Sequence, residues 1–171
     1  GTCVVFLEVG ERVKFDKECL LDYVNQGVAE GYEEGYLRKS IVEDPLEKRV
    51  NTKTNTPDVV HTEIVPGDKF KISVMAKGSG CENMSAFKAF PPAAGVEGVK
   101  KFVLDTVLNA GGNPCPPLIL GIGLGGDFEK CALLAKKALF RELRYRHPNP
   151  YYANLERELL DYRLKQKVLG S

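Results

Sequence analysis

The chain alternates between short apolar runs and longer segments in which apolar residues recur every three or four positions. Residues 2–10, TCVVFLEVG, are apolar and rich in β-branched side chains, which predicts a buried strand. Residues 17–36 carry apolar side chains at helical spacing, with Asp16 as the expected N-cap. Residues 38–58 are polar and rich in turn formers, so we expect a long loop that has a function or is covered by a partner.

The middle of the chain predicts two strands and then a helix. VVHTEIV at 59–65 and KFKISVMAKG at 69–78 alternate apolar and polar residues, and the turn residues 66–68 between them indicate a hairpin. Residues 97–109 place their valines and a phenylalanine on one helical face, and the glycines at 111–112 are expected to stop this helix.

The last third of the chain predicts a strand and two more helices. LILGIGLGG at 118–126 is typical of a strand, and Asp127 is the expected N-cap of a helix that reaches about Leu143. After the breaker HPNP, a final helix is expected from about Tyr151 past Leu160. Strands that alternate with helices predict an α+β, layered α/β fold: a single domain with a mixed sheet flanked by helices.

Composition narrows the functional classes. With 171 residues, 43% hydrophobic content and a formal net charge of +1, the chain resembles an ordinary globular domain and offers no basic surface for nucleic acid or membrane. No apolar run approaches the length of a membrane span, and no signal peptide is recognised, so we expect a cytoplasmic protein. The five cysteines lack CxxC spacing, which argues against a disulfide framework or a self-contained zinc site.

Two glycine-bearing segments are candidates for anion binding. Gly121, Gly123 and Gly126 satisfy G-x-G-x-x-G, which predicts either a nucleotide-binding turn or tight packing of a turn against its helix, and packing is favoured because no acidic strand end follows. Residues 77–80, KGSG, could hold a substrate carboxylate with Lys77 and backbone amides, or form a tight turn with a solvated lysine. With two histidines in the chain, a Cys81–His dyad is disfavoured.

Long stretches of the chain match one enzyme family. Three stretches resemble class I, iron-sulfur dependent fumarate hydratase and L-tartrate dehydratase. They are LRKS, TNTPDVVHTEIVPGD, and the run from KGSGCENMSAFKAF through GGNPCPPLILGIGLGGDFEK to the lysine pair beyond it. The likeness is closest to the α subunit, or N-terminal catalytic domain, and covers nearly the entire chain. The resemblance implies a hydro-lyase that adds or removes water on a dicarboxylic hydroxy acid, with fumarate/malate expected first and tartrate next.

The resemblance also implies a site. The cysteine of the CPP motif, Cys115, would be one of three ligands of a [4Fe-4S] cluster whose open iron acts as a Lewis acid on the leaving hydroxyl. By the resemblance, Arg38 would contact a substrate carboxylate and Gly80 would be a substrate-contacting glycine, while Lys77 joins them as a substrate-binding candidate through the charge of its loop. We further expect the loops 77–80 and 121–126 to face the same cleft as Cys115.

Other family features have no counterpart in this sequence. The first cluster cysteine would precede Gly1, the third would follow the last helix, and the acid and base would lie elsewhere. None of Cys3, Cys19, Cys81 and Cys131 is a convincing replacement ligand. We therefore expect residues 1–171 to be a fragment of the α-type domain, truncated at both ends, inactive alone and without its own cluster. It would require a β subunit or C-terminal domain and belong to an oligomer. A nucleotide-binding module and a non-catalytic scaffold remain the alternatives.

Overall fold

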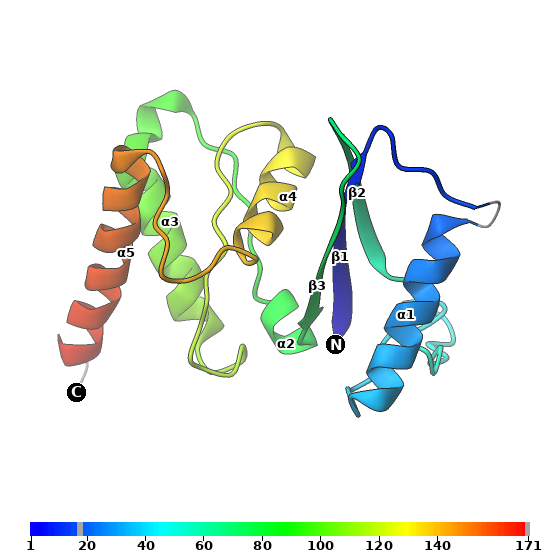
Figure 1. Cartoon of the computed structure of the whole chain (residues 1–171). Helices are drawn as coiled ribbons and strands as arrows, with labels where there is room; N and C mark the ends of the chain where they lie inside the picture. Colours follow the sequence, from blue (N-terminus) through cyan, green and yellow to red (C-terminus); the bar gives the residue numbers. More distant parts are fainter. Residues whose placement is uncertain (17–18, 170–171) are drawn as a thin grey trace. The chain divides into compact units, whose positions relative to one another are not determined.

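The computed structural model describes residues 1–16 and 19–169, with side chains as far as residue 161. The elements follow in the order β1 (Thr2–Gly10), α1 (Leu20–Glu34), β2 (Val59–Val65), β3 (Phe70–Lys77), α2 (Ser79–Glu82), the 3-10 turn η1 (Pro92–Ala94), α3 (Gly95–Ala110), α4 (Phe128–Ala138) and α5 (Pro150–Leu169). A mixed sheet with helices confirms the predicted α+β class (Figure 1). Contacts along the chain define two compact units, Gly1–Asn83 and Met84–Ser171.

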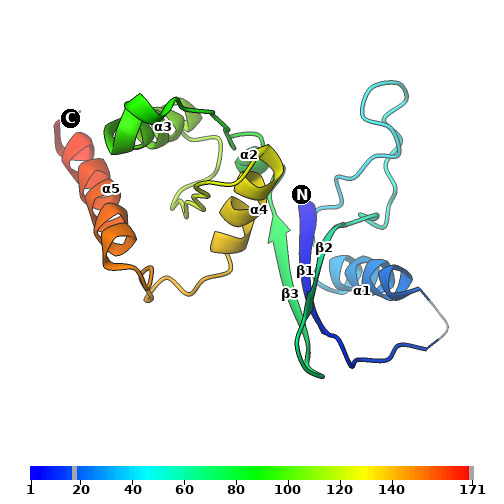
Figure 2. The same cartoon turned by 90° about the horizontal axis from the view of Figure 1, so that it is seen from above.

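The sheet of the first unit has the strand order β2-β1-β3. β1 runs parallel to β2, with Val5 opposite Val60, and antiparallel to β3, with Val5 opposite Val74. A parallel pair needs a crossover connection, and α1 supplies it between β1 and β2 (Figure 2). The central strand is the one whose side chains are almost all buried, because both of its edges are paired.

The predicted hairpin between residues 59–65 and 69–78 is wrong. Both segments are strands, but they pair with β1, which lies between them. The connection at residues 66–69 instead crosses the end of β1, where the Gly10 N–H donates to the Lys69 carbonyl at 2.8 Å and the Glu11 N–H donates to the Val65 carbonyl at 2.9 Å. Glycine is required at position 10, since a Cβ there would lie 2.6 Å from the Gly67 carbonyl oxygen.

The core of the first unit lies between α1 and one face of β1. Alternate positions of the strand supply four buried side chains, and positions four apart on the helix supply two: Cys3, Val5, Leu7 and Val9, and Val28 and Tyr32. Beside this core, α1 and β3 line an apolar cavity of about 460 Å³. Its β3 wall stays partly open to solvent, since Val74 is 58% exposed.

α1 begins later than predicted. The expected start at Lys17 lies outside the described residues, and Cys19, in place of Asp16, occupies the N-cap position, without a side-chain cap hydrogen bond. The helix ends at Glu34, two residues before the expected end, and the Gly35 N–H donates to the Gly31 carbonyl at 3.0 Å. The polar segment that follows forms the predicted loop, drawn in cyan in Figure 2.

In the second unit, the three long helices form where the sequence predicts them. α3 ends at Ala110, where the C-cap Gly111 has a φ of 52° that suits glycine, and Asp127 caps α4 by accepting from the Lys130 N–H at 2.8 Å. The strand predicted at 118–126 is wrong: these residues form no strand within the described chain. A strand needs a partner backbone, and no strand is described in residues 84–169.

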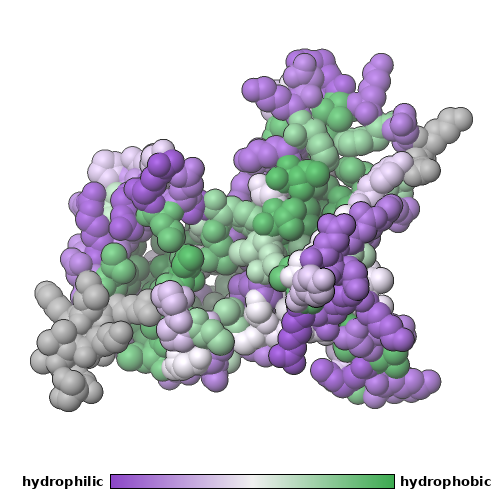
Figure 3. All heavy atoms as spheres, turned by 60° about the horizontal axis from the view of Figure 1, so that its bottom comes forward, coloured by the Kyte–Doolittle hydropathy of each residue, from purple (hydrophilic) through white to green (hydrophobic). Residues whose placement is uncertain are grey.

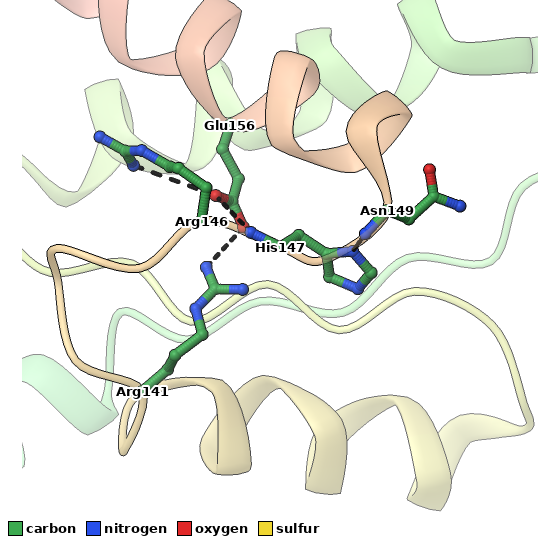
Figure 4. Close-up of polar contacts among 5 residues, drawn as sticks. All are labelled: Arg141, Arg146, His147, Asn149 and Glu156. Carbon is green, nitrogen blue, oxygen red and sulfur yellow. Dashed lines mark hydrogen bonds and ion pairs between the residues drawn. The ribbon is translucent and has the colours of Figure 1, made fainter.

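α4 is shorter than predicted, and charged side chains attach the segment after it to α5. The helix ends at Ala138 rather than near Leu143. In the connection to α5, the Arg141 guanidinium pairs with the Glu156 carboxylate, which also accepts from the His147 backbone N–H at 3.3 Å and lies 4.0 Å from Arg146 (Figure 4). These contacts hold the segment in turns, so it does not extend the helix.

Large apolar side chains remain at the surface of both units, visible as green areas among the polar purple in Figure 3. In the second unit they include Ile119, Leu120 and Phe128. Within the described residues, no helix is long and apolar enough to cross a membrane.

Candidate functional site

The start of β1 gathers residues that the sequence places far apart. Thr2 lies opposite Lys77, so the beginning of β1 meets the end of β3. A Cβ on Gly1 would lie 2.9 Å from the Lys77 carbonyl oxygen and 3.8 Å from the Arg38 carbonyl oxygen, so the backbone of residue 38 runs beside the same strand end. The structure thus brings Arg38 and Lys77 to one end of the sheet.

Lys77 already has an acidic partner. Its ammonium lies 2.8 Å from the Glu82 carboxylate, and its side chain is 13% exposed. The pair joins the end of β3 to α2, the short helix that contains Gly80, and Gly80 itself is exposed. A substrate carboxylate at Lys77 would therefore face Glu82 as well, which the sequence prediction did not include. The expected substrate contact of Lys77 stays a prediction.

The half-buried Asp58 and the buried Cys3 lie beside this strand end. Burial raises the pKa of Asp58 to about 6, and no hydrogen-bond partner reaches its carboxylate oxygens within the described chain. Burial, and then the Asp58 charge, raise the pKa of Cys3 to about 11, so this thiol stays protonated at neutral pH. Cys3 is therefore a core residue and a poor metal ligand.

Cys115 is presented differently from the buried cysteine. It is exposed and adopts a left-handed backbone with φ of 55°, in the turn that follows α3. Its N–H donates to the Gly112 carbonyl at 3.1 Å, which fixes the turn beneath the thiol. The flanking prolines 114 and 116 remove backbone freedom on both sides. A rigid, exposed thiol is what a metal ligand needs, so the local geometry suits the proposed role.

The described residues do not gather the ligands of a cluster site. Among the described residues, no three of His, Cys, Asp and Glu are close enough to hold a metal ion. The second unit contains one other cysteine, Cys131, and its thiol donates to the Gly123 carbonyl at 3.1 Å. A [4Fe-4S] cluster with one open iron needs three thiolates, so the residues present fit one corner of such a cluster and no more.

The glycine cluster packs against its own helix. A Cβ on Gly121 would lie 2.1 Å from the Ala135 carbonyl oxygen, and one on Gly123 would lie 2.1 Å from the Cys131 carbonyl oxygen, so both positions need glycine for the segment to contact α4. The Asp127 side chain accepts the N–H of Lys130 at the start of α4, where a phosphate would bind. This confirms the packing interpretation and weighs against the nucleotide-binding alternative.

The predicted common cleft stays a prediction. Arg38, Lys77 and Gly80 belong to the first unit, whereas Cys115 and the glycine turn belong to the second.

Comparison with known proteins identifies the family. Residues 1–168 match fumarate hydratase (Fumerase), so the chain belongs to this family. A Methanocaldococcus jannaschii protein with the provisional name L(+)-tartrate dehydratase subunit alpha is 41% identical over 167 residues, which are 94% of this chain and 58% of that protein. The L(+)-tartrate dehydratase subunit alpha of Escherichia coli strain UTI89 and that of Shigella sonnei are each 35% identical over 93% of this chain and 53% of their own length. The chain thus spans little more than half of these relatives.

Sequence reasoning missed two residues at the strand end. Glu82 pairs with Lys77, and Asn55 accepts backbone N–H groups from the loop that carries Arg38. Glu82 could have been noticed as an acid in the short helix after KGSG. Asn55 had a weaker signal, because asparagine in a polar loop is expected at a solvated turn.

Proposed function

We propose that this chain is the substrate-binding and single-cysteine part of an iron-sulfur hydro-lyase α subunit, acting on a dicarboxylic hydroxy acid. The complete enzyme would include a [4Fe-4S] cluster, with Cys115 as one ligand, and a β subunit or equivalent domain. Support comes from the family match and from the tartrate dehydratase α subunits among the relatives. The cytoplasmic location and oligomeric assembly expected from the sequence stay predictions.

The observation that carries the proposal is that the backbone of Arg38 and the end of β3, with Lys77, meet at the start of β1. A dicarboxylate needs cationic and N–H donors that lie close together, and a guanidinium can give a carboxylate two parallel hydrogen bonds. Arg38 is exposed, so its side chain can reach a ligand at the surface of this unit. Arg38 would bind and orient one substrate carboxylate, while the Lys77–Glu82 pair holds Gly80 at the end of β3.

The choice of substrate is open between two acids. The names of the relatives favour tartrate over the fumarate/malate pair that the sequence puts first. Dehydration of malate yields fumarate, and dehydration of tartrate yields the enol of oxaloacetate, so the two products can be followed separately.

Turnover by the complete α and β subunits, purified without oxygen, tests the proposal. The wild type is expected to dehydrate L-malate or L-tartrate, and Arg38→Lys should lower kcat/KM at least about tenfold because lysine cannot make the paired contact. Arg12→Lys is the matched control. Arg12 is also exposed, but it follows β1 at the opposite end of the strand, and its lysine variant should keep wild-type kinetics. An Arg38→Lys enzyme with wild-type kinetics would remove Arg38 from the site.

A further inference from the structure

Among the described residues of the first unit, Asn55 is the polar side chain that is fully buried. It has no exposed surface, although it lies in the most polar loop of the chain. Its Oδ1 accepts two backbone hydrogen bonds, from the N–H of Ser40 at 2.7 Å and from the N–H of Ile41 at 3.1 Å. A buried acceptor that serves two backbone donors fixes the path of the segment that carries them. The segment fixed here begins two residues after Arg38.

Residues 38–41 are held from two sides. On one side, the backbone of Gly1 at the start of β1 packs against them, since a Cβ there would lie 3.8 Å from the Arg38 carbonyl oxygen. On the other side, Asn55 accepts from Ser40 and Ile41, across a separation of about fifteen residues in the loop. The loop between them adds two more bonds to this segment, from the Asn51 side-chain amide to the Lys39 carbonyl at 3.1 Å and from the Thr52 N–H to the Ile41 carbonyl at 3.0 Å. Asn55 therefore closes the loop onto the strand end.

The Arg38 side chain has no such anchor of its own. Within the described part of the chain, no acidic side chain pairs with its guanidinium. A long side chain without a partner samples several rotamers, and the backbone it grows from determines the region of space it can reach. The hydrogen bonds that hold the residues after Arg38, those of Asn55 to Ser40 and Ile41 among them, thus limit where the guanidinium is available.

We infer that Asn55 is a positioning residue that holds residues 38–41 so that the Arg38 guanidinium meets a carboxylate of the substrate. This inference rests on the proposed function, because it takes Arg38 as the substrate-binding residue. Asn55 itself is fully buried and does not touch the ligand; it acts through the backbone on either side of Ser40.

Amide hydrogen exchange of this chain tests the contact without any activity measurement. In Asn55→Ala, the amides of Ser40 and Ile41 should exchange at least tenfold faster, while that of Val5, inside the sheet, should keep its rate. Asn25→Ala is the matched control. The Asn25 Oδ1 also accepts one loop N–H, that of Asp58 at 3.1 Å, but it lies on α1. It should leave the two amides unchanged, and wild-type exchange in Asn55→Ala would overturn the inference.

Kinetics of the complete enzyme test the role. Asn55→Ala should raise the KM for the dicarboxylate at least fivefold with kcat changed less than threefold, because a misplaced arginine loses binding in the ground state and the transition state alike. Asn55→Asp retains an oxygen acceptor for both N–H groups and should recover KM to within twofold of wild type. Asn25→Ala should keep the wild-type KM, and thermal melts will show that each variant is folded.

A double-mutant cycle separates positioning from general stability. In an Arg38→Ala background, Asn55→Ala should change kcat/KM less than twofold, since no guanidinium remains to be positioned. Independent, multiplicative effects of the two substitutions would overturn the inference, as would an unchanged KM in Asn55→Ala. A wild-type enzyme that turns over neither malate nor tartrate would instead overturn the proposed function, whatever the exchange rates show.

Discussion

Replacing Gly123 by alanine should break the contact between the glycine turn, residues 121–126, and α4. The new Cβ would lie 2.1 Å from the Cys131 carbonyl oxygen and 2.7 Å from the Ala135 backbone nitrogen. Non-bonded heavy atoms are comfortable at roughly 3.5 Å, so the segment would have to move by more than about 1 Å. Both opposing atoms are helix backbone, and no flexible side chain can give way.

The expected loss of stability is about 3 kcal/mol. Overpacking of a rigid site costs about 1–3 kcal/mol, and the upper half of that range, about 2–2.5 kcal/mol, applies because the obstacle is backbone. The movement would also break the hydrogen bond from the Cys131 thiol to the Gly123 carbonyl, now 3.1 Å, which adds about 0.5–1 kcal/mol. For a chain of this length, a loss of about 3 kcal/mol lowers Tm by roughly 6–12 °C.

Urea unfolding and thermal melts, both followed by circular dichroism, measure the effect. Gly112→Ala is the matched control, because no atom lies within 4 Å of its would-be Cβ and its φ is not positive. Its stability should match the wild type or exceed it slightly, since alanine restricts the unfolded chain. A Gly123→Ala protein within about 0.5 kcal/mol of wild type would refute the packing argument. If that variant also lost the binding of a dinucleotide, the nucleotide-binding alternative would return.

Three further predictions concern single groups. Anaerobic reconstitution of this chain should yield no [4Fe-4S] cluster that survives desalting, because Cys115 is one thiolate where three are needed; a stoichiometric cluster would contradict this. Burial raises the pKa of Asp58 from 3.8 to about 6, so wild-type stability should fall as pH rises from about 4 through 6. Asp58→Asn should remove that fall and be more stable at pH 8 by about 1 kcal/mol, a value reduced for partial exposure; equal pH dependence in both proteins would refute it. Maleimide should label the exposed Cys19 and Cys115 well before the buried Cys3, and equal rates would show that the core opens readily.

Much of the local structure followed from the sequence alone. The apolar run at 2–10 became the buried strand β1, and the glycine after α3 and the aspartate before α4 became helix ends where expected. These features depend on neighbours in the chain, namely side-chain periodicity, a positive φ and one cap hydrogen bond. Cys115 and Arg38 were also selected from the sequence as site candidates, through the family motifs that contain them, and their roles stay predictions.

The partners of these elements were decided by tertiary structure. Residues 59–65 and 69–78 have the pattern of a hairpin, yet each pairs with β1, because an apolar strand is most stable when both of its edges are covered. Residues 118–126 have the pattern of a strand but form none in the described chain, since a strand exists only beside another backbone. The Lys77–Glu82 pair and the burial of Asn55 likewise depend on which loops lie together at the start of β1. The spacing of residues along the sequence does not indicate which loops these are.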